Sequence, residues 1–123
     1  MIARSVIVAC SIISATTLVG HRALAATPFD GDWSVLILTH NGQCERAYRY
    51  GLAIRDGQVL YGGDAAVNVS GRVSGNGAVT VRVSAGSQSA QGSGRLSRAQ
   101  GSGKWRGTGS SGSCSGIWSA ERR

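Results

Sequence analysis

In several segments after residue 31, apolar side chains alternate with polar residues and glycines, most clearly over 48–54, 67–73 and 79–83. A period of two predicts half-buried β-strands, because successive side chains of a strand point to opposite faces. The region carries no sustained three-to-four-residue spacing of the kind that predicts an amphipathic helix. The pattern therefore predicts an all-β domain of short antiparallel strands joined by tight turns.

The clearest hairpin is predicted around Asp56-Gly57, a dipeptide that favours a two-residue type I′ turn. The pairs that follow from this turn are Arg55 with Gln58, Ile54 with Val59, and Leu52 with Tyr61. Both arms then place their large apolar residues on one face, so turn chemistry and hydrophobic pattern agree on the register. Tyr48 and Tyr50 fall on the same face, where we expect them to pack in the core.

A second hairpin is predicted between the valine-rich segments 67–73 and 79–83. A two-residue Asn76-Gly77 turn would set valines opposite polar residues on the wrong face. A three-residue loop, 75–77, instead pairs Val73 with Val79 and Val69 with Val83. We therefore predict this loop, with Gly77 providing the positive φ of a β-bulge.

A third hairpin is predicted around Gln100-Gly101, which brings Leu96 opposite Trp105. The preceding arm, residues 87–95, contains serine, glutamine, alanine and glycine without a large apolar side chain. One interpretation is a flexible linker. The other, which we favour, is a thin strand whose glycines let large aromatic side chains pack over it.

An opening strand around 33–38 and a closing strand around 117–121 raise the count to about eight strands in a meander. A single open sheet of this length would expose unpaired edges that promote aggregation. Closure into a small antiparallel barrel removes both edges, and we predict an eight-stranded barrel. A two-sheet sandwich is the alternative.

The first residues have the features of a signal peptide. Arg4 precedes an apolar stretch over 6–19, and Ala23-Leu24-Ala25 is a small-x-small cleavage signature. The apolar stretch is shorter than the roughly 20 residues that a membrane-spanning helix needs. We predict a signal peptide over 1–26 that includes Cys10, and a single domain over 27–123. The domain is then exported, to the periplasm or the outside, with no transmembrane segment after signal removal.

The predicted domain contains two cysteines, Cys44 and Cys114. An even number of cysteines in an exported chain predicts a disulfide. A domain this small buries a modest fraction of its surface, so a covalent link across a long loop contributes substantially to its stability.

A short motif, Gly-x-Trp, occurs three times: Gly31-Asp32-Trp33, Gly103-Lys104-Trp105 and Gly116-Ile117-Trp118. Glycine allows close approach of a neighbouring backbone, and tryptophan fills the space that this opens. We therefore expect Trp33, Trp105 and Trp118 to belong to the structural core.

The opening Gly31-Asp32-Trp33, the hairpin meander and the final Arg122-Arg123 resemble the lipocalin and avidin-like barrels, the calycin group. In lipocalins a Gly-x-Trp opens the first strand, and a basic side chain near the last strand packs across that tryptophan. The resemblance implies that Arg122 or Arg123 covers Trp33. It also implies a cup, which in so short a chain is shallow or filled by side chains, and no ligand is carried over.

Small size, export and one disulfide also resemble the exported bacterial barrels that inhibit metalloproteases. A barrel-type protease inhibitor is therefore an alternative function, although no inhibitory segment is identified in this chain.

The chain is basic, with a formal net charge of +7, and arginine supplies nearly all of the positive charge. Such a balance favours anionic partners. The arginines predicted on outer strand faces are the candidate anion-contacting residues: Arg49, Arg55, Arg72 and Arg82. Nucleic-acid readers interleave exposed aromatic side chains for stacking. Here Arg49 and Tyr50 point to opposite faces, so we expect an anionic envelope polymer and no nucleic acid.

Catalytic chemistry has little support in the sequence. His40 is the only histidine of the predicted domain, and no Gly-x-Ser-x-Gly elbow accompanies it. Asp30 and Asp32 flank one glycine but form an incomplete calcium site. We predict no catalytic residue, no cofactor and no metal. The expected function is non-enzymatic binding of an unknown small ligand or protein partner, with contact to anionic polymer as the alternative.

Overall fold

The structure is a computed structural model that describes residue 14 and residues 26–123. This part of the chain forms β-strands and no helix, which confirms the all-β class. The strands are β1 (Gly31–Asn41), β2 (Ala47–Arg55), β3 (Gln58–Leu60), β4 (Asn68–Val73), β5 (Ala78–Ala85), β6 (Gln88–Leu96), β7 (Gln100–Gly109) and β8 (Gly112–Arg122). Apart from positions 14 and 26, the predicted signal peptide over 1–26, including Cys10, lies outside the described residues.

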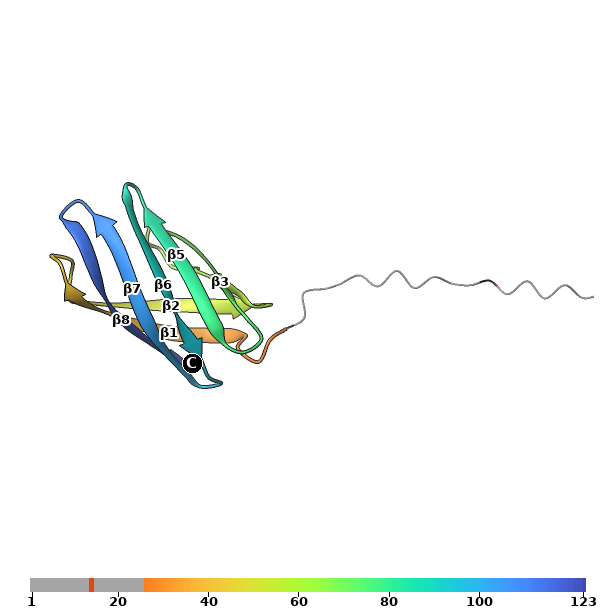
Figure 1. Ribbon diagram of the computed structural model, residues 1–123. Coiled ribbons are helices and arrows are strands. Elements are labelled where there is room, and N and C mark those ends of the chain that lie inside the picture. Colours follow the sequence, from red (N-terminus) through yellow and green to blue (C-terminus); the bar gives the residue numbers. More distant parts are fainter. Residues whose placement is uncertain (1–13, 15–25) are drawn as a thin grey trace, which may run out of the picture.

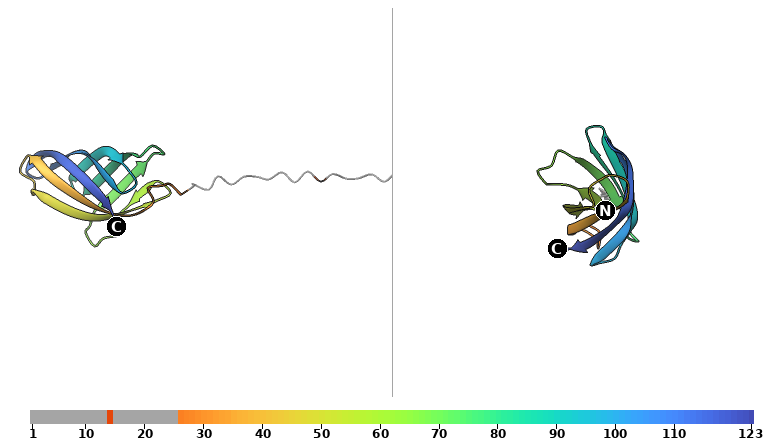
Figure 2. Two further views of the ribbon diagram at one scale, coloured as in Figure 1. Left: turned by 90° about the horizontal axis from the view of Figure 1, so that it is seen from below. Right: turned by 90° about the vertical axis from the view of Figure 1, so that its left-hand side faces the viewer.

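The eight strands form an antiparallel meander that closes into a barrel, as predicted. Closure is made by β1, which pairs with β2 on one side and with β8 on the other. Figures 1 and 2 show β1 and β8 side by side, and Figure 1 shows β1 and β2 crossing the direction of β5–β7. A barrel, not the alternative sandwich, is therefore the solution to the edge problem.

The first two hairpins have the predicted registers. Ile54 pairs with Val59 in the first, where the turn has positive φ at both Asp56 (53°) and Gly57 (75°). The predicted pairing of Leu52 with Tyr61 is not part of this ladder, because β3 ends at Leu60.

In the second hairpin, Val73 pairs with Val79 and Val69 with Val83, as the three-residue loop requires. The amide of Ser74 donates to the carbonyl of Ala78 at 2.8 Å, and Gly77 has a φ of 89°. Alternation of valines was therefore a reliable guide to the register where a two-residue turn would have reversed the faces.

The third hairpin differs from its prediction. Its thin first arm is a strand, β6, but Leu96 pairs with Gly101 and Trp105 pairs with Gly92. The turn is centred two residues earlier than predicted, within 97–100, where the Ser97 amide and hydroxyl both donate to the carbonyl of Gln100. Because β6 is rich in small residues, its local pattern does not select a register.

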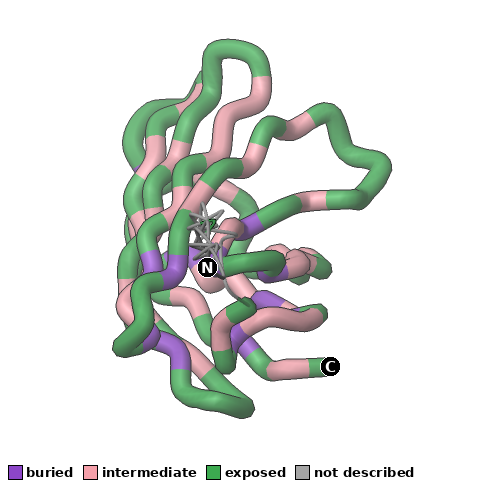
Figure 3. The backbone as a smooth tube through the Cα atoms, turned by 90° about the vertical axis from the view of Figure 1, so that its right-hand side faces the viewer, coloured by how far each residue is buried: buried purple, intermediate pink, exposed green. Residues whose placement is uncertain are grey.

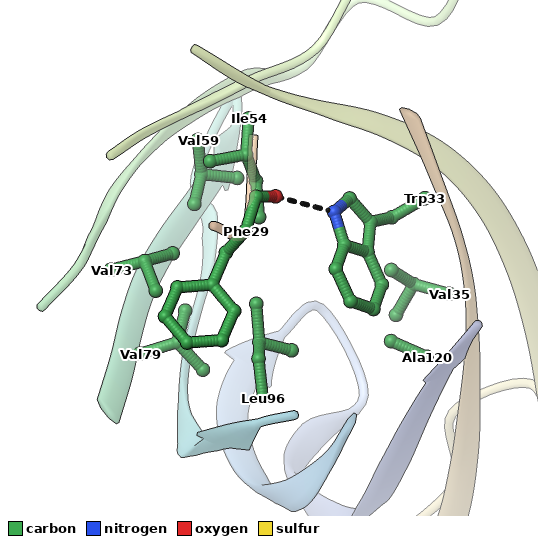
Figure 4. Close-up of a cluster of buried hydrophobic side chains, with 9 residues drawn as sticks. All are labelled: Phe29, Trp33, Val35, Ile54, Val59, Val73, Val79, Leu96 and Ala120. Carbon is green, nitrogen blue, oxygen red and sulfur yellow. Dashed lines mark hydrogen bonds between the residues drawn. The ribbon is translucent and has the colours of Figure 1, made fainter. Parts of the chain in front are cut away.

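The core gathers at one end of the barrel, which we call the closed end. Trp33 is 2% exposed, and its indole N–H donates to the carbonyl of Phe29 at 2.9 Å (Figure 4). The buried cluster consists of Phe29, Trp33, Val35, Ile54, Val59, Val73, Val79, Leu96 and Ala120. Elsewhere along the strands, exposed positions alternate with partly buried ones (Figure 3).

Arg122 ties the last strand to the first residues of the domain. Its guanidinium carbon lies 4.8 Å from the ring centroid of Trp33, a cation–π contact. Its side chain also donates to the carbonyls of Pro28, Asp30 and Arg98 at 2.5–2.7 Å. Arg122, and not Arg123, thus covers Trp33. Membership of the lipocalin group is a separate matter and stays a proposal.

Candidate ligand-binding cavity

Above the core, the barrel encloses a cavity of about 380 Å³ that is partly open to solvent. It extends from the core toward the opposite end of the barrel, which we call the mouth. The mouth carries the β5–β6 and β7–β8 turns and the link between β1 and β2. The lining is mainly apolar, with Ile37, Leu52, Val69, Val81 and Trp118 as its middle layer. The cup that the resemblance implies is therefore not filled by side chains.

Glycines and tryptophans build one wall of the cavity, on β6, β7 and β8. Trp118 lies over β7 and β6. A Cβ on Gly103 would come within 2.6 Å of its Cε2 atom, and a Cβ on Gly94 within 2.6 Å of its Cζ2 atom. The indole N–H of Trp118 donates to the carbonyl of Ser93 at 3.2 Å. The ring is thus held flat against the sheet by both steric fit and a hydrogen bond.

Trp105 on β7 extends toward β8 and β1, away from the strands that Trp118 covers. Its ring extends from β7 across Gly116 on β8, where an added Cβ would lie 3.0 Å from the indole nitrogen. The indole N–H donates to the carbonyl of Leu38 on β1 at 3.0 Å. Both rings therefore lie along the wall, instead of projecting across the cavity and filling it.

This arrangement explains two of the three Gly-x-Trp motifs. In the β7–β8 ladder, Gly103 pairs with Trp118 and Trp105 pairs with Gly116. The glycine of each motif is therefore the platform for the tryptophan of the other. Each of these two motifs makes room for the tryptophan of the other, and the sequence motif alone does not show this relation.

Tyrosines form the facing wall of the cavity, on β2 and on the segment that follows β3. The rings of Tyr48 and Tyr50 stack with centroids 6.1 Å apart, and Tyr61 meets Tyr50 edge-on at 6.2 Å. Burial raises the pKa of the Tyr50 phenol above its ordinary value, and Tyr48, Tyr61 and Glu45 add to the rise. These rings line the cavity instead of packing in the core as expected.

The wall is thin beside these tyrosines, because β3 is short and pairs with β4 at a single position, Gln58 with Arg72. Tyr50, Leu52 and Tyr61 line both the cavity and an outer groove next to β2. Tyr50, Leu52 and Tyr61 therefore lie between the cavity and that groove.

A disulfide closes the rim. Cys44, which lines the cavity, is bonded to the buried Cys114 at the start of β8, as predicted from the cysteine count. The bond joins the β1–β2 link to β8, so it holds the strands of the mouth together where the apolar core is absent. A disulfide is consistent with an oxidising, exported location.

The cavity is chemically simple. The described residues that line it include no aspartate, glutamate, lysine, arginine or histidine. Polar groups are confined to tyrosine hydroxyls, to Cys44 and to a few small or amide side chains near the mouth, such as Gln88 and Thr108. Within the described ranges, no three potential metal ligands cluster, and His40 is exposed on β1. Such a lining can hold an apolar molecule, and it offers no charged group to a reaction.

The predicted core tryptophans and the candidate arginines lie in different parts of the barrel. Trp33 is in the buried core, Trp118 packs against it, and Trp105 lies outside that cluster, on the cavity wall. The candidate anion-contacting arginines are all exposed on outer strand faces: Arg49, Arg55, Arg72 and Arg82. Arg55 and Arg72 lie two strands apart on one row, because both pair with Gln58. Arg82 lies diagonally next to Arg72 on β5, whereas Arg49 lies farther along β2.

Sequence reasoning missed the cavity itself. The signal was present in the many glycines of β6–β8, three of which lie under the indoles of Trp105 and Trp118: Gly94, Gly103 and Gly116. It also did not place Arg95, Lys104 and Arg106 on one outer surface, because that placement depends on the register of β6 and β7.

Comparison with known proteins places no relative beside this chain: no family model, no curated protein and no solved structure matches it. Nor does the described part of the chain contain a helix that is long and apolar enough to cross a membrane.

Proposed function

We propose that this domain is a non-enzymatic binding module that holds a small apolar ligand in the barrel. The observation that carries the proposal is the uncharged, mainly apolar cavity of about 380 Å³. This volume lies in the range of about 300–1,000 Å³ that is typical of small-molecule sites. Water in such a lining gains few hydrogen bonds, so its displacement by an apolar ligand is favourable.

The position of the polar groups indicates the form of the ligand. An apolar body fits between the indoles of Trp105 and Trp118 and the valines of β4 and β5. One polar end of the ligand, facing solvent, would meet the tyrosine hydroxyls and Gln88 at the mouth. An anionic or cationic group deep in the barrel has no counter-charge there, so its desolvation is uncompensated.

The wider proposal is an exported carrier, periplasmic or extracellular, similar to a small lipocalin. Two features support it: the disulfide, and the contact of Arg122 with Trp33 that closes the end below the ligand. The absence of charged groups from the described cavity lining favours binding over catalysis. The protease-inhibitor alternative has no inhibitory segment to support it.

A fluorescent apolar probe, N-phenyl-1-naphthylamine, tests the proposal. We expect saturable binding at one site, with a change in the emission of the tryptophans that line the cavity. Ala90→Trp, on the inner face of β6, places an indole in the cavity and should abolish the binding. Ser70→Trp, on the exposed outer face of β4, adds the same side chain outside and should leave it unchanged.

Equal binding by both variants, or probe binding without saturation, would contradict the proposal. Native mass spectrometry of protein purified gently from its own host provides a second readout, because a discrete small-molecule adduct identifies the natural ligand. The same spectrum reports the two-hydrogen mass deficit of the disulfide.

A further inference from the structure

Charge is unevenly distributed around the barrel. Between Asp64 and Glu121 the sequence contains no acidic residue, and this span includes all of β4, β5, β6 and β7. The outer faces of these strands carry five basic residues, which we call the cationic face: Arg72, Arg82, Arg95, Lys104 and Arg106.

The strand registers bring these residues together. Arg82 pairs with Gln91, which pairs with Arg106, so the two arginines lie two strands apart on one row, roughly 10 Å. On the next row, Arg72, Thr80, Ser93 and Lys104 follow one another across four strands. Arg95 lies on the third row, diagonally next to Lys104. Positive groups thus recur in both directions of one continuous surface.

The other outer arginines have different surroundings. Arg55 lies 3.4 Å from the carboxylate of Asp32, and Arg49 donates to the hydroxyl of Ser34. The strands β1 to β3 and their links also carry Glu45 and Asp56. Acidic side chains therefore offset the positive charge on that side of the barrel, and the candidate set has to be divided. Arg72 and Arg82 belong to the cationic face. Arg55 lies on the same row as Arg72 through Gln58, but Asp32 offsets its charge, and Arg49 lies farther along β2.

Polar neutral side chains fill the spaces between the positive groups. Those that share the outer faces and rows of the cationic face are Ser70, Thr80, Gln91, Ser93 and Ser102. Hydroxyl and amide groups can both donate and accept hydrogen bonds, as sugar hydroxyls do. None of the tryptophans or tyrosines adds a ring to this face, because they lie in the core or along the cavity. Base stacking therefore has no platform here.

We infer that the cationic face binds an acidic polysaccharide, through ion pairs with its carboxylate or sulfate groups and hydrogen bonds to its hydroxyls. The inference does not depend on the proposed ligand in the cavity, which lies on the other side of the same strands. A polymer on the outer surface and a small molecule in the barrel would be bound at the same time, and the protein would then carry its ligand at an anionic surface.

Two triple variants of equal charge test the inference. Arg82→Gln/Lys104→Gln/Arg106→Gln removes three charges from the cationic face. Arg46→Gln/Arg49→Gln/Arg55→Gln removes three charges from the exposed residues of β2 and its approach. Binding to heparin and to polygalacturonate is measured against salt concentration, with neutral dextran and a DNA duplex as comparisons. Both variants should keep the melting temperature of the unaltered protein, which reports an intact barrel and keeps this test independent of the cavity.

We expect the first variant to lose about tenfold or more in affinity for both acidic polysaccharides and to show a shallower salt dependence, because fewer counterions are released. The second variant should lose much less. Equal losses in the two variants would mean that diffuse net charge is responsible and would overturn the inference. Tighter binding of the DNA duplex than of either polysaccharide at the same salt would overturn it as well.

Discussion

The closed end and the mouth of this barrel are stabilised by different means. At the closed end, buried valines, Phe29 and Trp33 pack together, and Arg122 connects the first and last segments through carbonyl hydrogen bonds. Between the two ends the barrel is hollow. At the mouth, the Cys44–Cys114 disulfide joins the strands at the rim. Packing therefore stabilises one end and covalent cross-linking the other.

The difference shows how a domain of this size can contain a cavity. A small barrel has little apolar surface to bury, and an empty volume removes packing contacts from its lining. Concentrating the core at one end and linking the strands covalently at the other leaves the middle available for a ligand. The predictions below test this division of roles between the two ends.

The largest effect is expected from Trp33→Ala. It removes the most buried large side chain of the closed end, together with its hydrogen bond to Phe29 and its contact with Arg122. Loss of a buried tryptophan destabilises by about 3–5 kcal/mol. Trp105→Ala, on the partly exposed cavity wall, should cost much less. Denaturant unfolding compares the two, and equal losses would contradict the assignment of the core to one end.

Removal of the disulfide should have the next largest effect. The bond closes a loop with a sequence separation of 70, for which chain entropy predicts about 4 kcal/mol. Cys44→Ser/Cys114→Ser removes the bond without leaving a free thiol, and a reduced sample of the unaltered protein is its control. Thermal unfolding measures the loss. An unchanged melting temperature would show that the mouth does not depend on the cross-link.

A smaller effect is expected from Gly103→Ala. The added methyl group would collide with the carbonyl of Ser93 and with the ring of Trp118, so the strand or the indole must move. Overpacking of this kind costs about 1–3 kcal/mol. Gly75→Ala, with open space at its Cβ position, is the matched control and should be nearly neutral. Denaturant midpoints compare the pair, and the proposed probe binding should weaken in Gly103→Ala alone.

The smallest effect concerns acid stability at the closed end. The side-chain hydrogen bond from Thr27 holds the pKa of Asp30 below its ordinary value, against the opposing effect of burial, and the amides of Asp56 and Gly57 contribute too. A carboxylate with a lowered pKa contributes stability at neutral pH that is lost as the pH falls through its folded-state pKa.

The stability of the unaltered protein should therefore decline in acid, from about pH 5 downward. Asp30→Asn should be less stable at neutral pH and should show a flatter decline. Asp64→Asn, in an exposed segment, is the control and should follow the unaltered protein. Melting temperature against pH measures the difference, and parallel curves for Asp30→Asn and the unaltered protein would refute this contribution.

The parts of the fold that were predictable are those where the turn residues and the hydrophobic alternation favour the same register. Around Asp56-Gly57 and around 75–77, the turn residues and the alternating valines and isoleucines favour the same register, and both registers are confirmed. Around Leu96 the neighbouring residues are small, so several registers bury similar amounts of apolar surface. The register there is settled by contacts from distant strands. Leu96 joins the closed-end core, and its amide donates to the carbonyl of Gly77.

The candidate site was harder to predict than the fold, because the cavity exists where inward positions lack a side chain. A glycine has no side chain, so an alternation of apolar and polar residues does not show that it faces inward. Whether a side chain fills the space above it depends on the neighbouring strand. Tyr48 and Tyr50 have the same apolar spacing whether they pack in a core or line a cavity. Their role therefore could not be read from their positions alone.

By itself, the sequence determined the strand class, the first two turns and the pairing of Cys44 with Cys114, because each depends on local backbone preferences or on a simple count of partners. Tertiary structure decided where the barrel is filled and where it is hollow, how Trp105 and Trp118 exchange glycine platforms, and which basic residues share a surface. These features depend on the register between strands that are distant in sequence, and that register follows from the packing of the closed barrel as a whole.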